Sequence, residues 1–149
     1  MMEESEPRTA TTRWVIQHDV LLFYGNGGLF RGEGVARWYA ELQAAESLRL
    51  VVVGAGSEFS FDPGVRAQGT EFFKRRKLPL AVVAENPMQR MLGLTARMLG
   101  TDLQIYPWDE SARSFQQLDV SRAIVEQLND SLKRLRRDID QELRVLGPR

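Results

Sequence analysis

The stretch over residues 78–110 most constrains the fold of this chain, because two short apolar runs flank a segment with helical patterning there. The runs are Leu80–Ala84 and Leu103–Tyr106, and Asn86-Pro87 opens the segment between them. Asparagine caps helices because its side-chain oxygen accepts from free backbone N–H groups, and proline fits the first helical position, where no N–H is needed. The stretch therefore predicts a β-α-β unit and, with it, an α/β fold.

The flanking sequence predicts further elements around this unit. A continuous apolar run at 50–53 indicates a central strand that is covered on both faces. Asp62-Pro63 repeats the combination of capping residue and proline at the start of a second helix. In chain order we expect a flexible tail over 1–11 and then a hairpin of strands 13–18 and 20–24 that turns at His18-Asp19. A helix over 33–47, the strand at 50–53 and a helix from Pro63 to the cations Lys74-Arg75-Arg76-Lys77 follow. The β-α-β unit, whose helix ends near Gly100, and a long C-terminal helix complete the chain.

Composition limits the classes of function. A length of 149 residues fits one domain with its own core, and the 20 lysines and arginines balance the 20 aspartates and glutamates. No net charge is available to recruit nucleic acid or an anionic membrane. Without cysteine and with one histidine, the chain offers no thiolate chemistry and no ordinary zinc site. We therefore expect a cytoplasmic protein with no cofactor, no metal, no nucleic acid and no membrane among its partners, because no export signal or long apolar run is present either.

The C-terminal segment over 119–149 has apolar residues at alternating steps of three and four, which is typical of an amphipathic helix. The stripe consists of Val125, Leu128, Leu132, Leu135 and Ile139. Such a stripe must cover another surface, and three coverings are open: the sheet of its own domain, the same helix of a second copy, or a different protein. These five residues are therefore the candidates for an interaction surface, and a homodimer is expected. The basic band at Lys133, Arg134, Arg136 and Arg137 is interpreted as a solubilising outer face.

Two glycine-rich segments could in principle bind a ligand. Gly54-Ala55-Gly56-Ser57-Glu58-Phe59 begins like a dinucleotide fingerprint, but Phe59 stands where the third glycine belongs, so turn glycines are the favoured reading. The loop Gly25–Gly34 lacks the Gly-Lys-Ser or Gly-Lys-Thr ending of a phosphate-binding loop. We interpret it as a flexible loop, with a flap over a ligand or partner as the alternative.

A ligand of an open α/β sheet binds beyond the carboxyl ends of the parallel strands, and the residues of that rim can be named. The candidate ligand rim consists of Ser57, Ser60, Asp62 and Asn86. The carboxylates of Glu58, Glu85, Asp109 and Glu110 share the rim, and they disfavour a nucleotide because they repel phosphate. They are interpreted as acids that suit helix N-termini, with a site for a cation or a basic peptide as the alternative.

The order of elements resembles that of the sulphate transporter and anti-sigma factor antagonist (STAS) domain and its SpoIIAA-like relatives, over residues 12–118. The most specific parts are similar to bacterial STAS-like proteins of unknown function: Ser60-Phe61-Asp62-Pro63, Leu80-Ala81-Val82-Val83 with Asn86-Pro87 and Arg90, and Ile105-Tyr106 leading into Asp109-Glu110-Ser111-Ala112. Phosphorylatable antagonists carry an Asp-Ser pair before the second helix, and this chain departs from it, which argues against a phosphoswitch. The resemblance implies a single mixed sheet with an N-terminal hairpin and β-α-β crossovers.

The same resemblance implies a small noncatalytic module that works through protein contacts. We find no catalytic constellation in the sequence, and His18 has no positioned nucleophile or second base beside it. The expected function is therefore regulation or scaffolding through protein–protein association. The alternative is a small-molecule carrier or sensor, with a pocket between the sheet and the loop Gly25–Gly34.

Overall fold

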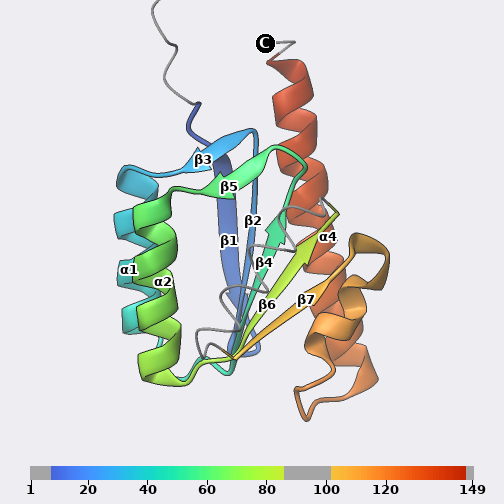
Figure 1. The fold of residues 1–149 in the computed structure, drawn as a ribbon. Coiled ribbons are helices and arrows are strands. Elements are labelled where there is room, and N and C mark those ends of the chain that lie inside the picture. Colours follow the sequence, from blue (N-terminus) through green and yellow to red (C-terminus); the bar gives the residue numbers. More distant parts are fainter. Residues whose placement is uncertain (1–7, 86–101, 147–149) are drawn as a thin grey trace, which may run out of the picture.

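The chain folds as a three-layer α/β structure in a computed structural model that describes residues 8–85 and 102–146 (Figure 1). A five-stranded sheet forms the middle layer, with the order β1-β2-β4-β6-β7. Its strands are β1 (Thr11–Gln17), β2 (Val20–Asn26), β4 (Leu50–Ala55), β6 (Leu80–Ala84) and β7 (Leu103–Tyr106). β1 runs antiparallel to β2, and all other neighbours are parallel. The predicted mixed sheet is confirmed, including the parallel pairing of the two runs at 80–84 and 103–106.

Helices cover both faces of this sheet (Figure 1). On one face lie α1 (Glu33–Ala44) and α2 (Pro63–Arg76), and on the other lie the 3₁₀ helix η1 (Trp108–Phe115) and the long helix α4 (Arg122–Val145). All residues of β4 are buried, as the continuous apolar run predicts for a strand covered on both sides. The sheet thus separates two hydrophobic cores. The first contains the aromatic rings of Phe23 and Trp38, and the second contains Tyr24, Trp108 and the apolar side of α4.

The opening hairpin turns where the sequence indicates. His18 and Asp19 have φ angles of 51° and 61°, so both adopt the left-handed conformation that a two-residue hairpin turn requires. The turn sets Gln17 opposite Val20, and the pairing continues without interruption to Thr11 and Asn26.

The second helix begins at Pro63 as predicted, although the Asp62 side chain makes no capping hydrogen bond. Hydrogen bonds connect the C-terminal end of α2 to the C-terminal end of α1. Arg76 donates to the carbonyl oxygens of Leu42 (2.6 Å) and Ala45 (3.2 Å). These carbonyls lie in the last turn of α1 and at its C-cap, where a cation is favourable. One of the four cations that close α2 therefore holds the two helices together.

Several elements differ from the expectation. The strands β3 (Gly28–Phe30) and β5 (Phe59–Phe61) pair in parallel as a separate two-stranded sheet, so the predicted loop is partly strand. The 3₁₀ helix η1 was not predicted, and α1 ends at Ala44 rather than at residue 47. The helix expected between Asn86 and Gly100 lies outside the described residues, as does most of the expected tail.

The apolar stripe of the C-terminal helix packs on the sheet of its own chain. Leu128, Leu132 and Ile139 are fully buried in the second core, and Val125 and Leu135 are partly buried against it. Of the three coverings considered from the sequence, the structure has this one. None of the helices in the described ranges has the length and apolarity needed to cross a membrane.

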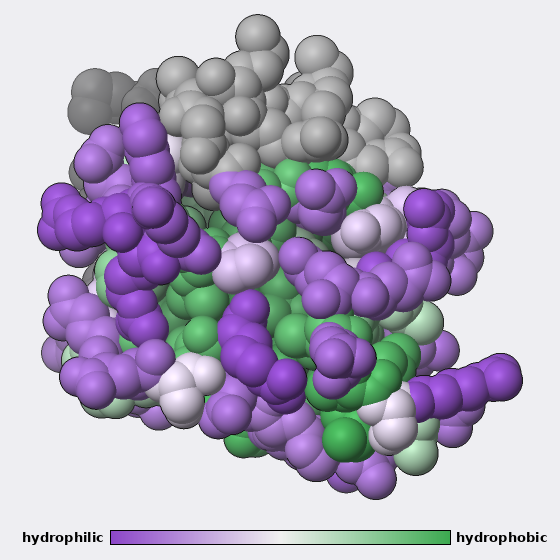
Figure 2. Space-filling model, turned by 90° about the horizontal axis from the view of Figure 1, so that it is seen from below, coloured by the Kyte–Doolittle hydropathy of each residue, from purple (hydrophilic) through white to green (hydrophobic). Residues whose placement is uncertain are grey.

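Figure 2 shows the end of the molecule at which the parallel strands begin. Apolar side chains occupy the middle of this face, and hydrophilic side chains frame them. Leu48 and Leu78, which precede β4 and β6, are both buried members of the first core. A network of polar side chains joins the sheet to α4 at the other end, where the parallel strands finish.

Candidate functional site

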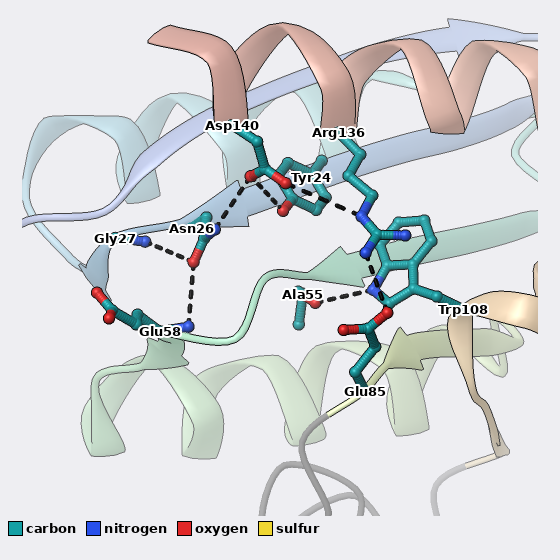
Figure 3. A network of polar contacts seen from close by, with 9 residues as sticks. All are labelled: Tyr24, Asn26, Gly27, Ala55, Glu58, Glu85, Trp108, Arg136 and Asp140. Carbon is teal, nitrogen blue, oxygen red and sulfur yellow. Dashed lines mark hydrogen bonds and ion pairs between the residues drawn. The ribbon is translucent and has the colours of Figure 1, made fainter. Parts of the chain in front are cut away.

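A network of polar side chains joins α4 to the carboxyl ends of the parallel strands (Figure 3). Tyr24 and Asn26 come from the end of β2, and Asp140 comes from α4. The Tyr24 hydroxyl donates to Oδ1 of Asp140 at 2.6 Å, and Nδ2 of Asn26 donates to the same oxygen at 3.0 Å. One carboxylate thus receives two donors from the same strand. We call Tyr24, Asn26, Glu85, Trp108, Arg136 and Asp140 the carboxyl-edge network.

Asn26 also fixes the loops on either side of it. Its Oδ1 accepts from the backbone N–H of Gly27 at 2.8 Å and from that of Glu58 at 3.1 Å. Gly56 makes this possible, because a Cβ at that position would lie 2.0 Å from Cγ of Asn26. The asparagine therefore uses both ends of its amide to connect α4, the turn after β2 and the turn after β4.

Arg136 forms the second half of the network. Its guanidinium lies over the Trp108 ring, 4.3 Å from the ring centroid, and donates through Nη2 to Oε1 of Glu85 at 3.1 Å. Its Nε is 3.9 Å from Oδ2 of Asp140. Trp108 itself donates from Nε1 to the carbonyl oxygen of Ala55 at 3.0 Å. The cation is held by two carboxylates and an aromatic face at once.

Burial and the neighbouring carboxylate favour the protonated form of the Tyr24 hydroxyl. Burial raises the pKa of Tyr24 well above its usual range, and the hydrogen bond to the Asp140 carboxylate raises it further. The phenol therefore keeps its proton at neutral pH and cannot serve as a base there. The donors and acceptors of this network are paired with one another. Its role is therefore structural, because it fixes α4 on the sheet.

The described residues of the predicted ligand rim belong to different elements. Glu58 and Glu85 lie at the network, but Ser60 belongs to β5, and Asp62 precedes α2 on the side of the first core. Ser57 lies in the turn before β5, and Asn86 lies outside the described residues. Across the residues that the structure describes, no three histidine or acidic side chains gather in a way that could hold a metal ion.

The glycines of the fingerprint-like segment make room for side chains of the same chain. A Cβ on Gly54 would lie 2.7 Å from Cη2 of Trp108. Gly25 of the neighbouring strand β2 does the same for the segment's Phe59, because a Cβ on Gly25 would lie 2.4 Å from the Phe59 ring. Phe59, which stands at the third glycine position, is buried in the first core. Gly54 therefore lies within β4 and leaves room for Trp108, whereas Gly56 follows the strand and leaves room for Asn26.

Aromatic rings fill the space between the sheet and the loop Gly25–Gly34. The ring centroids of Phe23 and Phe30 are 5.1 Å apart, and those of Phe59 and Phe61 are 5.0 Å apart. Phe30, Phe59 and Trp38 are almost completely buried. In the described ranges, the small parallel sheet β3-β5 therefore closes over a packed core at the place where the sequence suggested a pocket.

Sequence reasoning did not select Tyr24, Asn26, Trp108 or Asp140, and it placed Arg136 in a solubilising band. The available signal is the spacing of Arg136 and Asp140, which are four residues apart and flank the apolar stripe of α4. That spacing indicates that both residues lie on the same side of α4, but it does not indicate which strand this side of the helix contacts.

A second feature is a surface groove of about 460 Å³ between the two helices of the other face, which we call the α1–α2 groove. Val35, Tyr39 and Val65 form its apolar, buried floor. Its remaining lining consists of Arg31, Gly32, Ala36, Ala40, Gln43, Asp62 and Gln68. The Tyr39 hydroxyl donates to the carbonyl oxygen of Val65 at 3.1 Å and ties α1 to α2 beneath the groove.

Comparison of the chain with known protein families and with curated proteins finds no match. Its function is therefore inferred from the geometry of the carboxyl-edge network and of the α1–α2 groove.

Proposed function

We propose that this protein is a noncatalytic regulatory or scaffolding module of the STAS and SpoIIAA-like type, and that it acts through protein–protein association. A cytoplasmic site of action is part of the proposal. The mixed sheet with its opening hairpin supports the family assignment, because the resemblance implies this arrangement. The observation that carries the functional proposal is the α1–α2 groove.

The groove has the composition of a protein-docking site. An apolar floor with a polar rim is the usual anatomy of a protein interface. Ala36 and Ala40 lie one helical turn apart on α1, and their small side chains allow a partner backbone to approach closely. We infer that the occupant is an amphipathic segment of a partner protein, whose apolar side chains rest on Val35, Tyr39 and Val65.

The carboxyl edge supports the same reading. Ligands of open α/β sheets bind beyond the carboxyl ends of the strands, but here Arg136 and Asp140 of α4 engage that edge. The space under the loop Gly25–Gly34 is filled by aromatic rings. The alternative function, a carrier or sensor of small molecules, has less support because these rings occupy the space between the sheet and the loop.

Photo-crosslinking in the native host tests the proposal. A photoreactive residue in place of Ala40 is expected to give one adduct of defined mass, because that position lines the groove. Ala67, exposed on α2 outside the groove, is the matched control and should give no adduct. The substitution Ala36→Arg should abolish the adduct while leaving the fold intact, because the side chain is exposed.

Equal labelling from positions 40 and 67, or no labelling at all, would contradict docking in the groove. A small molecule retained in a native mass spectrum of the purified chain would favour the carrier alternative.

A further inference from the structure

Strand β1 forms one edge of the five-stranded sheet, and in the described part of the chain β2 is its only neighbour there. The two-residue turn at His18-Asp19 makes Gln17 and Val20 a hydrogen-bonded pair, and such pairs alternate with non-bonded pairs along an antiparallel ladder. The backbone N–H and C=O groups of Thr12, Trp14 and Ile16 therefore point away from β2. Among the residues that the structure describes, these groups form an open row of donors and acceptors.

This edge lacks the devices that normally block strand addition. Natural edge strands are kept apart by prolines, bulges, short length or several charges. β1 has seven residues in unbroken register, with neither proline nor bulge. Its one charged residue, Arg13, is paired with Glu142 of α4 at 2.7 Å. The strand also contains Ile16, the most exposed large hydrophobic residue of the sheet, at 41%.

The open stretch is centred on Trp14. At one end Ala10 donates to the carbonyl oxygen of Leu29 at 2.7 Å, so the chain there is already paired with β3. At the other end the hairpin turns at His18. Thr12 and Ile16 lie two residues on either side of Trp14. The outward-facing N–H and C=O groups are therefore arranged symmetrically about Trp14.

We propose that β1 pairs antiparallel with β1 of a second copy of this chain, about a two-fold axis at Trp14. Thr12 then pairs with Ile16 of the partner subunit, and Trp14 pairs with its own copy. A two-fold interface requires a self-complementary surface, and this strand edge is one. The product is a continuous sheet that runs through both subunits.

Two charged side chains of α1, Arg37 and Glu41, also lie next to Trp14, the centre of the open stretch. Arg37 lies over the Trp14 ring, 5.2 Å from its centroid, and Glu41 accepts a hydrogen bond from Trp14 Nε1. Both charged side chains are exposed and lie one helical turn apart. A two-fold axis at Trp14 reverses their order, so that Arg37 faces Glu41 of the partner subunit and Glu41 faces the partner's Arg37. Strand and helix thus select the same partner and the same register.

This inference rests on the proposed function for the idea of association and adds a specific partner, a second copy. Sedimentation of the full chain over the micromolar range tests it. The wild-type chain should sediment as a dimer. Ile16→Pro removes an outward-facing N–H and should give a folded monomer, whereas Ile16→Thr keeps that N–H and should remain dimeric. A monomeric wild type, or a dimer that persists in Ile16→Pro, would overturn the inference without affecting the crosslinking test of the groove.

The charged pair provides a test that does not depend on the strand. Arg37→Glu and Glu41→Arg should each be monomeric, because each places like charges across the axis. An equimolar mixture of the two variants should form a dimer, since every cross-axis contact is then between opposite charges. Recovery of the dimer on mixing also proves that both variants are folded. Two variants that stay monomeric when mixed, or that dimerise equally well alone, would overturn the proposed register.

Discussion

Gly56 shows how much of the carboxyl-edge network depends on a missing side chain. A Cβ there would overlap the Asn26 amide, whose closest atom would be 2.0 Å away. The amide would have to move and would lose its bonds to Asp140 and to the N–H groups of Gly27 and Glu58. Each lost hydrogen bond costs about 1 kcal/mol. We expect Gly56→Ala to lower the free energy of unfolding by roughly 2–4 kcal/mol in urea denaturation.

Gly64 is the matched control for this substitution. A Cβ at Gly64 would meet no atom closer than 4.0 Å, and the residue lies in the first turn of α2. Gly64→Ala should therefore stabilise the protein by up to about 1 kcal/mol, because alanine has the higher helix propensity. A Gly56→Ala variant that is as stable as the wild type would contradict the role of this space for the Asn26 amide.

At the level of elements, Asp140 makes polar contacts between α4 and β2 in addition to the apolar packing. Its removal leaves the buried Tyr24 hydroxyl and the Asn26 amide without their acceptor. We expect Asp140→Ala to cost roughly 2–3 kcal/mol and to speed hydrogen exchange along α4. Asp130→Ala, at an exposed position of the same helix, should change stability by less than about 0.5 kcal/mol. In the Tyr24→Phe background the cost of Asp140→Ala should shrink, and equal costs in both backgrounds would contradict the coupling.

The elements that the sequence predicts are those whose signal is local. Val51 to Val53 form an apolar run, and Asp62-Pro63 marks a helix start, so neither depends on distant residues. β3 and β5 could not be predicted in this way, because each has three residues and exists through pairing with a segment about thirty residues away. Their pairing is a property of the assembled fold.

The candidate site was missed for the same reason. Tyr24 and Asp140 are 116 residues apart, and their contact depends on where α4 crosses the sheet. The sequence shows that α4 has an apolar stripe, but a stripe can cover any apolar surface. The groove between α1 and α2 likewise results from the packing of two helices, and neither helix shows it alone.

Across the whole molecule, the two faces of the sheet share a sensitivity to alkaline pH. Tyr24 lies in the core under α4, and Tyr39 lies in the core under α1 and α2. Burial raises the pKa of Tyr39 to about 12, compared with about 10 for an unfolded tyrosine. Burial and the hydrogen bond to Asp140 raise the pKa of Tyr24 as well. Each of the two cores therefore contains a phenol that must stay protonated for the native packing to persist.

The consequence is a loss of stability above about pH 10. Below that pH both states hold the proton, and the contribution of Tyr39 is complete. Between about pH 10 and about pH 12 the unfolded chain releases the proton first, so Tyr39 alone lowers the free energy of unfolding by about 1.4 kcal/mol per pH unit, or roughly 3 kcal/mol in all. Urea denaturation across this range should show a shallower decline for Tyr39→Phe than for the wild type. Tyr106→Phe, at a partly exposed tyrosine, is the matched control. If Tyr39→Phe declined as steeply as the wild type, the alkaline sensitivity would have to arise elsewhere in the fold.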